Sequence, residues 1–156
     1  MVSLRATIEM TIEEQAAFLA NEPFGILGTI GHRGHPHLVT IGFAVDEAGV
    51  VVMTSFRSAQ KVVNARRAPD ASLLVERAGP YGDIQGTLLS GRLTVADDPR
   101  EVARCYRLVK RRSESLLDMS EFPPVDDDAL IAKRVALLLA VERRSSWDHR
   151  KLGGVY

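Results

Sequence analysis

Apolar residues alternate with polar or small ones along several short stretches of the chain, a pattern that predicts β-strands. The stretch 35–46 alternates over its whole length, as a strand does when one face is buried. Shorter apolar runs at 24–30, 50–53 and 71–76 and longer ones at 84–95 and 134–141 complete six predicted strands. The last run is apolar after its first residue, so we expect both of its faces to be covered.

Helix signals stand before and between these strands. Thr11 and Glu14 have the spacing of a capping box, and an acidic cap with Pro99 in the first turn opens a later helix. Another helix is predicted to end before Pro69, and a short one to follow residues 122–124. Since most strands follow one another in hairpins, the pattern predicts a mainly β protein with flanking helices. Its expected architecture is a six-stranded antiparallel barrel rather than a parallel βαβ sheet.

Composition narrows the class of protein. The length of 156 residues fits one domain over 1–156, and 46% apolar residues are enough for a core. The 20 Lys and Arg residues balance the 20 Asp and Glu residues, so no overall field draws the chain to nucleic acid or an anionic membrane. There is no run of the ~18 apolar residues that a membrane helix needs, nor a signal-peptide core at the start. We therefore expect a cytoplasmic protein that binds neither nucleic acid nor a membrane.

The segment 53–69 carries the strongest chemical signal. An apolar strand ends there on Thr54 and Ser55, and a cationic helix follows. Ser58 is a good N-cap residue, and Lys61 then falls in the first turn. Because backbone N–H groups are free at a helix start, they attract a phosphate, and nearby cations complete its neutralisation.

The helical wheel of this segment separates a binding side from a packing side. Arg57, Lys61 and Asn64 share one arc of the predicted helix. No acid occurs within 48–69, so the cations of the segment have no counterion nearby in the sequence. The apolar side chains face the other way and are expected to pack: Ala59, Val62 and Val63. We interpret the segment as an anion cradle; the alternative is a solvated basic face on a short surface helix.

Several motifs stand in a recognisable order along nearly the whole chain. They are 25–29 (GILGT), 34–38 (GHPHL), 54–55 (TS), 58–69 (SAQKVVNARRAP), 106–107 (YR) and 134–135 (RV). In this order and spacing they resemble the split β-barrel flavin and deazaflavin oxidoreductases, the pyridoxamine 5′-phosphate oxidase-like superfamily. The resemblance implies a homodimer with two equivalent cofactor sites at the subunit interface, and either FMN or coenzyme F420 as the cofactor.

The resemblance also assigns expected roles. Lys61 and Asn64 would hold the phosphate region, and Thr54 and Ser55 the ribityl and phosphate oxygens. Three residues of the second strand would meet the ring edge: His37, Val39 and Thr40. Arg57 is added on charge and wheel position alone. The full set of expected cofactor-binding residues is His37, Val39, Thr40, Thr54, Ser55, Arg57, Ser58, Lys61 and Asn64; no catalytic side chain is identified.

The short chain and its 58–64 pattern (SAQKVVN) are similar to the deazaflavin-using branch. This similarity implies that F420 transfers hydride to or from a small organic substrate of conjugated or carbonyl type, while the protein supplies positioning and electrostatics. Two alternatives stay open at this point. One is an FMN-binding, pyridoxamine-phosphate-oxidase-like oxidoreductase, and the other is a non-catalytic flavin or haem binder on the same barrel.

A cluster of histidines and the C-terminal tail also bear on function. His32, His35 and His37 lie in one short segment, but no cysteine or carboxylate nearby completes a ligand set, so no metal is expected. The tail 145–156 carries Trp147 and Tyr156, and aromatic residues of this kind are enriched at interfaces. We expect the tail to pack over the active site of a partner subunit; a frayed terminus is the alternative.

Overall fold

The computed structural model describes residues 4–153. Its helices are α1 (Leu4–Ile8), α2 (Ile12–Asn21), α3 (Gln60–Arg67), α4 (Pro99–Leu116) and α5 (Asp127–Ala132), with 3₁₀ turns η1 (Tyr81–Asp83) and η2 (His149–Leu152). Its strands are β1 (Phe24–Ile30), β2 (Pro36–Gly42), β3 (Ala44–Val45), β4 (Val51–Phe56), β5 (Asp70–Arg77), β6 (Gln85–Ala96) and β7 (Arg134–Asp148). Among these residues no helix is long and apolar enough to cross a membrane.

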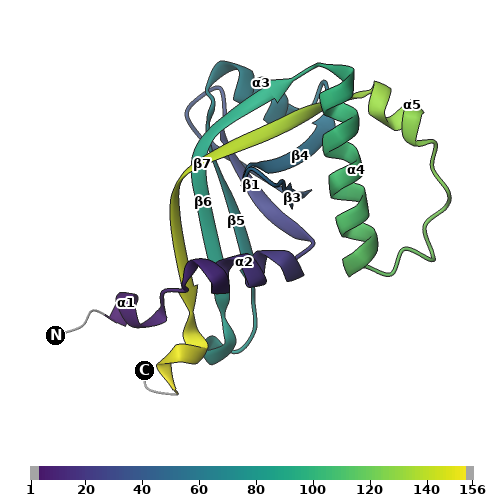
Figure 1. Ribbon diagram of the computed structural model, residues 1–156. Helices are drawn as coiled ribbons and strands as arrows, with labels where there is room; N and C mark the ends of the chain where they lie inside the picture. The colour runs from purple at the N-terminus through teal and green to yellow at the C-terminus, as the bar shows by residue number, and fades with distance from the viewer. Residues whose placement is uncertain (1–3, 154–156) are drawn as a thin grey trace.

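The strands form one curled antiparallel sheet with the order β2-β1-β5-β6-β7-β4-β3. β2 and β3 lie at opposite ends of this order, although only Phe43 separates them in the chain. The sheet therefore bends until its two edges meet (Figure 1). This confirms the predicted mainly β, antiparallel split barrel. Seven strands replace the six expected because the stretch 35–46 is divided at Phe43, whose side chain is fully buried.

The core fills the inside of the curled sheet. Leu27, Leu73, Leu89 and Leu137 come from β1, β5, β6 and β7, and each is 0% exposed. α2 covers one end of the barrel and α3 lies at the other (Figure 1); both helices contribute side chains to the same core. Burial of each large apolar side chain stabilises the fold by about 1.5–3 kcal/mol.

A second apolar cluster lies between α4 and the outer face of β4 and β7. Val102 and Cys105 of α4 meet Val52 of β4 and Ala136 of β7 there. Both faces of β7 are thus covered in its first half, as the apolar run 134–141 predicted. Burial raises the pKa of the Cys105 thiol to about 11, so Cys105 is a packing residue rather than a thiolate nucleophile.

Local helix signals are confirmed at two of the three caps that the sequence proposed. Thr11 Oγ1 accepts from the backbone N–H of Glu14 at 3.2 Å, and the Glu14 side chain accepts from the Thr11 N–H at 2.7 Å. Asp98 caps α4 with Pro99 in the first turn. The third cap is wrong: Ala59, not Ser58, is the N-cap of α3, and no side chain caps that helix.

β7 runs to Asp148 instead of ending at 141, so the start of the predicted tail is strand. Trp147 pairs with Gly86 of β6, and a Cβ on Gly86 would lie 2.4 Å from the Trp147 ring. The β6–β7 register shifts between Ser90 and Gly91. Tyr156 lies outside the described residues, and the contact of the tail with a partner stays a prediction.

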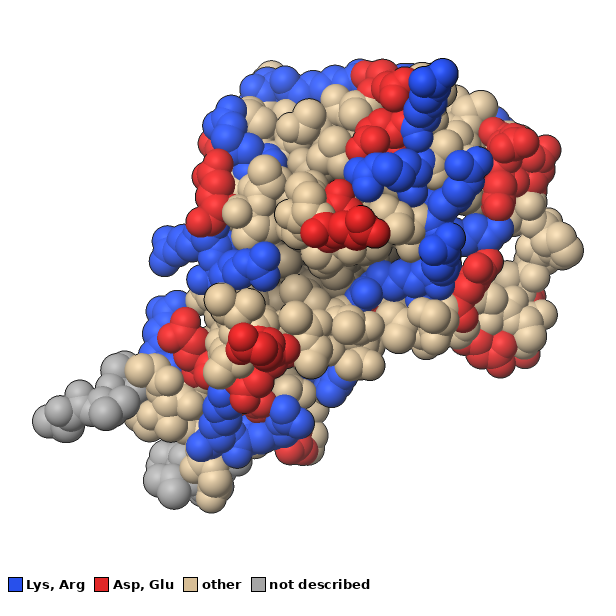
Figure 2. Space-filling model, in the orientation of Figure 1, with Lys and Arg blue, Asp and Glu red and all other residues tan. Residues whose placement is uncertain are grey.

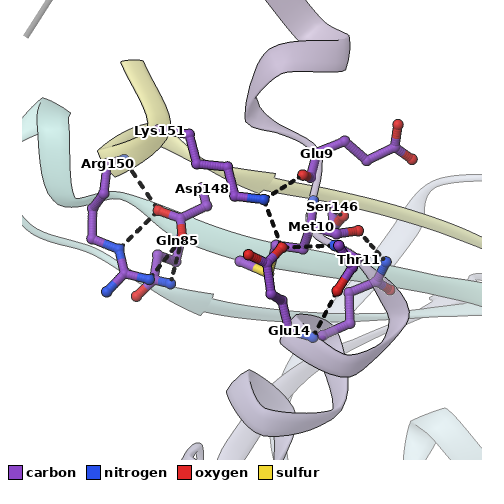
Figure 3. Close-up of polar contacts among 10 residues, drawn as sticks. Glu9, Met10, Thr11, Glu14, Gln85, Ser146, Asp148, Arg150 and Lys151 are labelled. Carbon is purple, nitrogen blue, oxygen red and sulfur yellow. Dashed lines mark hydrogen bonds and ion pairs between the residues drawn. The ribbon is translucent and has the colours of Figure 1, made fainter. Parts of the chain in front are cut away.

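Charged residues tie the two ends of the chain together (Figure 3). Buried Asp148 accepts from Gln85 Nε2 at 3.2 Å and from Arg150 Nε and Nη2 at 2.9 and 2.7 Å. Lys151 Nζ lies 2.6 Å from Glu14 Oε2 at the start of α2. We call these five residues the terminal latch; each of its carboxylates is paired with a cation.

Candidate functional site

α3 begins later than the sequence predicted, and this changes which side chains it presents. Arg57 and Ser58 lie in the turn before the helix, so they do not belong to its wheel. Val63, expected to pack, is 52% exposed, whereas Asn64, expected to face a ligand, is 1% exposed. The reason is that Val62, Asn64 and Ala65 form the buried side of the helix, and Val63 points away from it.

Asn64 connects α3 to β1 inside the protein. Its Nδ2 donates to Thr29 Oγ1 at 3.1 Å, and its Oδ1 accepts from Gln60 Nε2 at 2.8 Å. Thr29 is itself buried. These bonds fix the helix against the sheet, so in this arrangement Asn64 acts on the site by holding α3 in place.

Two cations of this segment find a counterion that lies outside it in the sequence. Asp97, in the turn between β6 and α4, forms ion pairs with both Arg57 and Arg66. Arg67 donates to the backbone carbonyl of Ile30. Asp97 is distant in the sequence, which is why a search for nearby acids missed it.

Lys61, like Arg67, has no carboxylate partner among residues 4–153. Its Nζ lies 3.3 Å from Ser55 Oγ, to which it donates a hydrogen bond. Partial burial lowers the pKa of Lys61, and the nearby charge of Arg134 lowers it further. The structure therefore confirms that Lys61 and Ser55 lie together, and it adds a second cation.

Arg134, the first residue of β7, was not among the predicted site residues. Its Nη1 donates to Thr54 Oγ1 at 3.4 Å, and its guanidinium lies 4.5 Å from the Phe56 ring centroid. Its Nε is buried without a hydrogen-bond partner, and burial lowers its pKa. The sequence did carry one signal for Arg134, because it is a single cation at the start of an otherwise apolar strand.

Lys61 and Arg134 contact neighbouring residues, Ser55 and Thr54, near the end of β4. Thr54 and Ser55 are consecutive, so their side chains point to opposite faces of the strand, and both are buried. We call Lys61 and Arg134 the cation pair. In the described part of the chain neither forms an ion pair with a carboxylate. The charge of Arg134 lowers the pKa of Lys61, and an anion within reach of both cations at the end of β4 would offset that unfavourable interaction.

The three predicted residues of β2 do not share one face. His37 and Val39 are half-buried on the inner side, while Thr40 is exposed on the outer side. His37 lies opposite Thr29, the residue that Asn64 contacts, and its Nδ1 is buried without a partner. The structure thus brings His37 to the α3 end of the barrel and leaves Thr40 apart from it.

The outer face of the barrel carries a hollow of about 500 Å³. Gly28, Ser72 and Ser90 form part of its floor, and Leu38 of β2 stands at its edge. Leu38 is 67% exposed. Small residues beside an exposed leucine give this face room for side chains from another molecule.

Comparison with known proteins identifies the family of this chain. The profile of the family described as Pyridoxamine 5'-phosphate oxidase matches residues 11–148. The chain belongs to the pyridoxamine 5′-phosphate oxidase family. Among curated proteins no sequence matches the chain.

Solved structures agree with that assignment. The conserved hypothetical protein Rv2991 from Mycobacterium tuberculosis is 32% identical, with a TM-score of 0.82, and the alignment covers 99% of this chain and 95% of that one. An F420 reductase is 23% identical with a TM-score of 0.64, covering 81% and 93%. A FAD-binding protein from Mesorhizobium loti is 18% identical with a TM-score of 0.66, covering 88% and 94%. The last two similarities show the fold.

Proposed function

We propose that this protein is an oxidoreductase that binds coenzyme F420 at the interface of a homodimer and transfers hydride to or from a small organic substrate. The observation that carries the proposal is the cation pair. Lys61 and Arg134 lie at the end of β4, beside buried hydroxyls, without a carboxylate partner in the described chain.

The residues at the cation pair fit a phosphate. Lys61 offers an ammonium group, and Arg134 offers a guanidinium whose Nε lacks a partner. Thr54 and Ser55 add hydroxyl groups that already accept from these cations and that can donate to a phosphate oxygen. Each charge-assisted hydrogen bond to phosphate contributes about 1.5–3 kcal/mol. These four side chains can therefore bind a phosphate without the Ser58 N-cap that the sequence suggested.

His37 supports a heterocyclic ring near the same end of the barrel. Its buried, unpartnered Nδ1 is a polar group beside apolar Val39, a combination typical of a slot for an aromatic ligand. When bound, the deazaflavin ring would supply two-electron hydride chemistry. The protein's part is to hold the phosphate at Lys61 and Arg134, to orient the ring edge at His37, and to keep water from it.

A homodimer explains the outer face. Leu38 and Thr40 are exposed there beside the hollow at Gly28 and Ser72, and a stable interface buries about 800 Å² on each partner. A second copy of the chain would cover Leu38 and give Thr40 a place at a shared cofactor site. Thr40, which lies away from His37 within a single chain, would then take part in the site.

The 58–64 pattern resembles the deazaflavin-using branch, and this resemblance favours F420 over FMN. The solved F420 reductase shares the fold. The FMN-binding oxidoreductase remains the second candidate because the FAD-binding protein from Mesorhizobium loti shares the fold equally well.

The test is a pair of titrations of the purified protein, one with F420 and one with FMN, followed by cofactor fluorescence. We expect saturable binding of F420, tighter than that of FMN, and weaker binding in Lys61→Met and Arg134→Gln. Arg57→Gln is the matched control, because this cation of the same segment is already paired with Asp97. Equal losses in all three variants would contradict the cation pair.

A second step separates an enzyme from a binder. Reduced cofactor is mixed with the protein and a panel of conjugated or carbonyl-type acceptors, and its reoxidation is followed by absorbance. Reoxidation that depends on both protein and acceptor supports an oxidoreductase. Tight binding with no reoxidation across the panel would contradict the enzymatic proposal and favour a cofactor binder.

A further inference from the structure

A second hollow, of about 480 Å³, opens at the end of the barrel that α2 covers. Ile12 and Ala16 of α2 form one wall, and Val45 and Val51 at the β3–β4 hairpin form another. Two cations, Arg112 and Arg144, complete the lining. Figure 2 shows a tan depression near the middle of the drawn face with basic side chains beside it.

Arg112 is a half-buried cation whose charge is only partly compensated. Its Nη2 donates to the backbone carbonyls of Leu19 and of Glu22, the latter at 2.7 Å, and its guanidinium lies 4.7 Å from the Phe43 ring centroid. Its Nε is buried with no hydrogen-bond partner. Among residues 4–153 it forms no ion pair with a carboxylate. Burial lowers its pKa, as it does for Lys61 and Arg134.

Arg144 approaches the hollow from β7. It lies opposite Leu89 of β6, which is fully buried in the barrel and also lines the hollow. Because side chains alternate along a strand, Arg144 points to the inner side and the adjacent Arg143 to the outer side, where Arg143 lines the other hollow. No ion pair of Arg144 occurs within the described chain.

We propose that this hollow binds a small amphipathic carboxylate. Its apolar body would lie against Ile12, Ala16 and Val51, and its carboxylate would bridge Arg112 and Arg144. The apolar lining favours a hydrocarbon body over water, and a carboxylate accepts from guanidinium groups with good geometry. An inorganic anion would make no apolar contact, and a neutral amphiphile would make no ion pair. Apolar wall and arginines together therefore favour an amphipathic carboxylate over either of these.

This site is separate from the cation pair. Val51 begins β4, whereas Thr54 and Ser55 lie near its other end, and fully buried Met53 stands between them. The core thus closes the path from one to the other. Binding at the α2 hollow does not depend on the proposed cofactor.

The experiment is isothermal titration of the full chain with octanoate, with octan-1-ol as the neutral probe of similar shape. We expect saturable binding of octanoate that is roughly tenfold tighter than that of octan-1-ol, the scale of one charge-assisted contact. Arg144→Gln should weaken octanoate binding by a similar factor. Arg143→Gln, on the other face of the same strand, should leave it unchanged.

A cavity-filling variant tests the place of binding. Ala16 is exposed on α2, so Ala16→Phe should fold with an unchanged circular dichroism spectrum and melting temperature, yet abolish octanoate binding. Equal affinity for octan-1-ol, or octanoate binding that survives both Arg144→Gln and Ala16→Phe, would overturn the proposal. Loss of octanoate binding in Lys61→Met would place the probe at the cation pair and would also overturn it.

Discussion

Charged side chains gather at both ends of the barrel, and the two groups are balanced in opposite ways. In the terminal latch, Asp148 is paired with Arg150 and Glu14 with Lys151. At the α3 end, Lys61 and Arg134 lie together with hydroxyl partners only. The pKa values of the Asp148 and Glu14 carboxyls are lowered, first of all by their hydrogen bonds to those cations, whereas burial lowers those of Lys61 and Arg134.

Charges that are paired within the fold thus stand at one end, and charges for which we propose an anionic ligand stand at the other. Paired charges favour their ionised forms in the folded state, so they contribute to stability. A cation whose pKa falls on folding is less favourable there than in the unfolded chain, and its presence costs stability unless an anion binds. If this distinction holds, the terminal latch and the cation pair can be changed independently of each other.

The largest expected effect is on stability at the latch. Asp148→Ala removes a buried carboxylate that accepts from Gln85 and Arg150, and we expect it to lower the free energy of unfolding by about 2–4 kcal/mol. Urea denaturation followed by circular dichroism measures the change. Asp70→Ala is the matched control, because Asp70 is an exposed carboxylate whose ion pair with Arg92 is 3.4 Å long. A large loss of F420 affinity in folded Asp148→Ala would show that the two ends are coupled.

Lys61→Met should give the opposite result. Cofactor affinity is expected to fall by about 1–3 kcal/mol, because one charge-assisted contact to phosphate is lost. The free energy of unfolding should stay unchanged or rise slightly, since the variant removes a repulsion between Lys61 and Arg134. Fluorescence titration and urea denaturation of the same preparation measure both quantities. If Lys61→Met destabilises the protein as Asp148→Ala does, the cation pair is a structural element.

Acid should weaken the latch first. The pKa values of Asp148 and Glu14 are lower in the folded protein than the ordinary values, which are about 3.9 for Asp and about 4.3 for Glu. Their contribution is complete above those ordinary values and is lost as the pH falls through the lowered ones, because the unfolded chain takes up protons first. Melting temperature measured against pH should therefore fall less steeply in Asp148→Ala than in the parent protein. Parallel curves would contradict this origin of the acid sensitivity.

The smallest effect is expected at the surface pairs of the α3 region. Asp97→Asn releases Arg57 and Arg66, whose side chains are each about half exposed. Exposed ion pairs contribute about 0–1 kcal/mol and are screened by salt. Stability should change by no more than that, and the difference should shrink further in high salt. A loss as large as that of Asp148→Ala would mean that the Asp97 pairs, and not only the latch, hold the fold together.

The sequence predicted correctly those features that depend on interactions between residues close together in the chain. The Thr11 to Glu14 box and the Asp98 cap act within one helical turn, so the spacing of residue types predicted both. The start of α3 was misplaced because its N-cap, Ala59, has no side-chain signal. Val63 and Asn64 were assigned to the wrong faces because the wheel was sorted by polarity, whereas Asn64 is buried with its amide hydrogen-bonded to Gln60 and Thr29.

By itself the sequence determined the order of strands and helices, the mainly β class, the family resemblance, and the closeness of Lys61 to Ser55. These depend on periodicity and on residues near one another in the chain. Only the tertiary structure decided which cations are neutralised: Asp97 reaches Arg57 from the far end of β6, and Arg134 reaches Thr54 across the β4–β7 pair. Those contacts join residues that no spacing rule connects, because the curl of the sheet determines which strand ends meet.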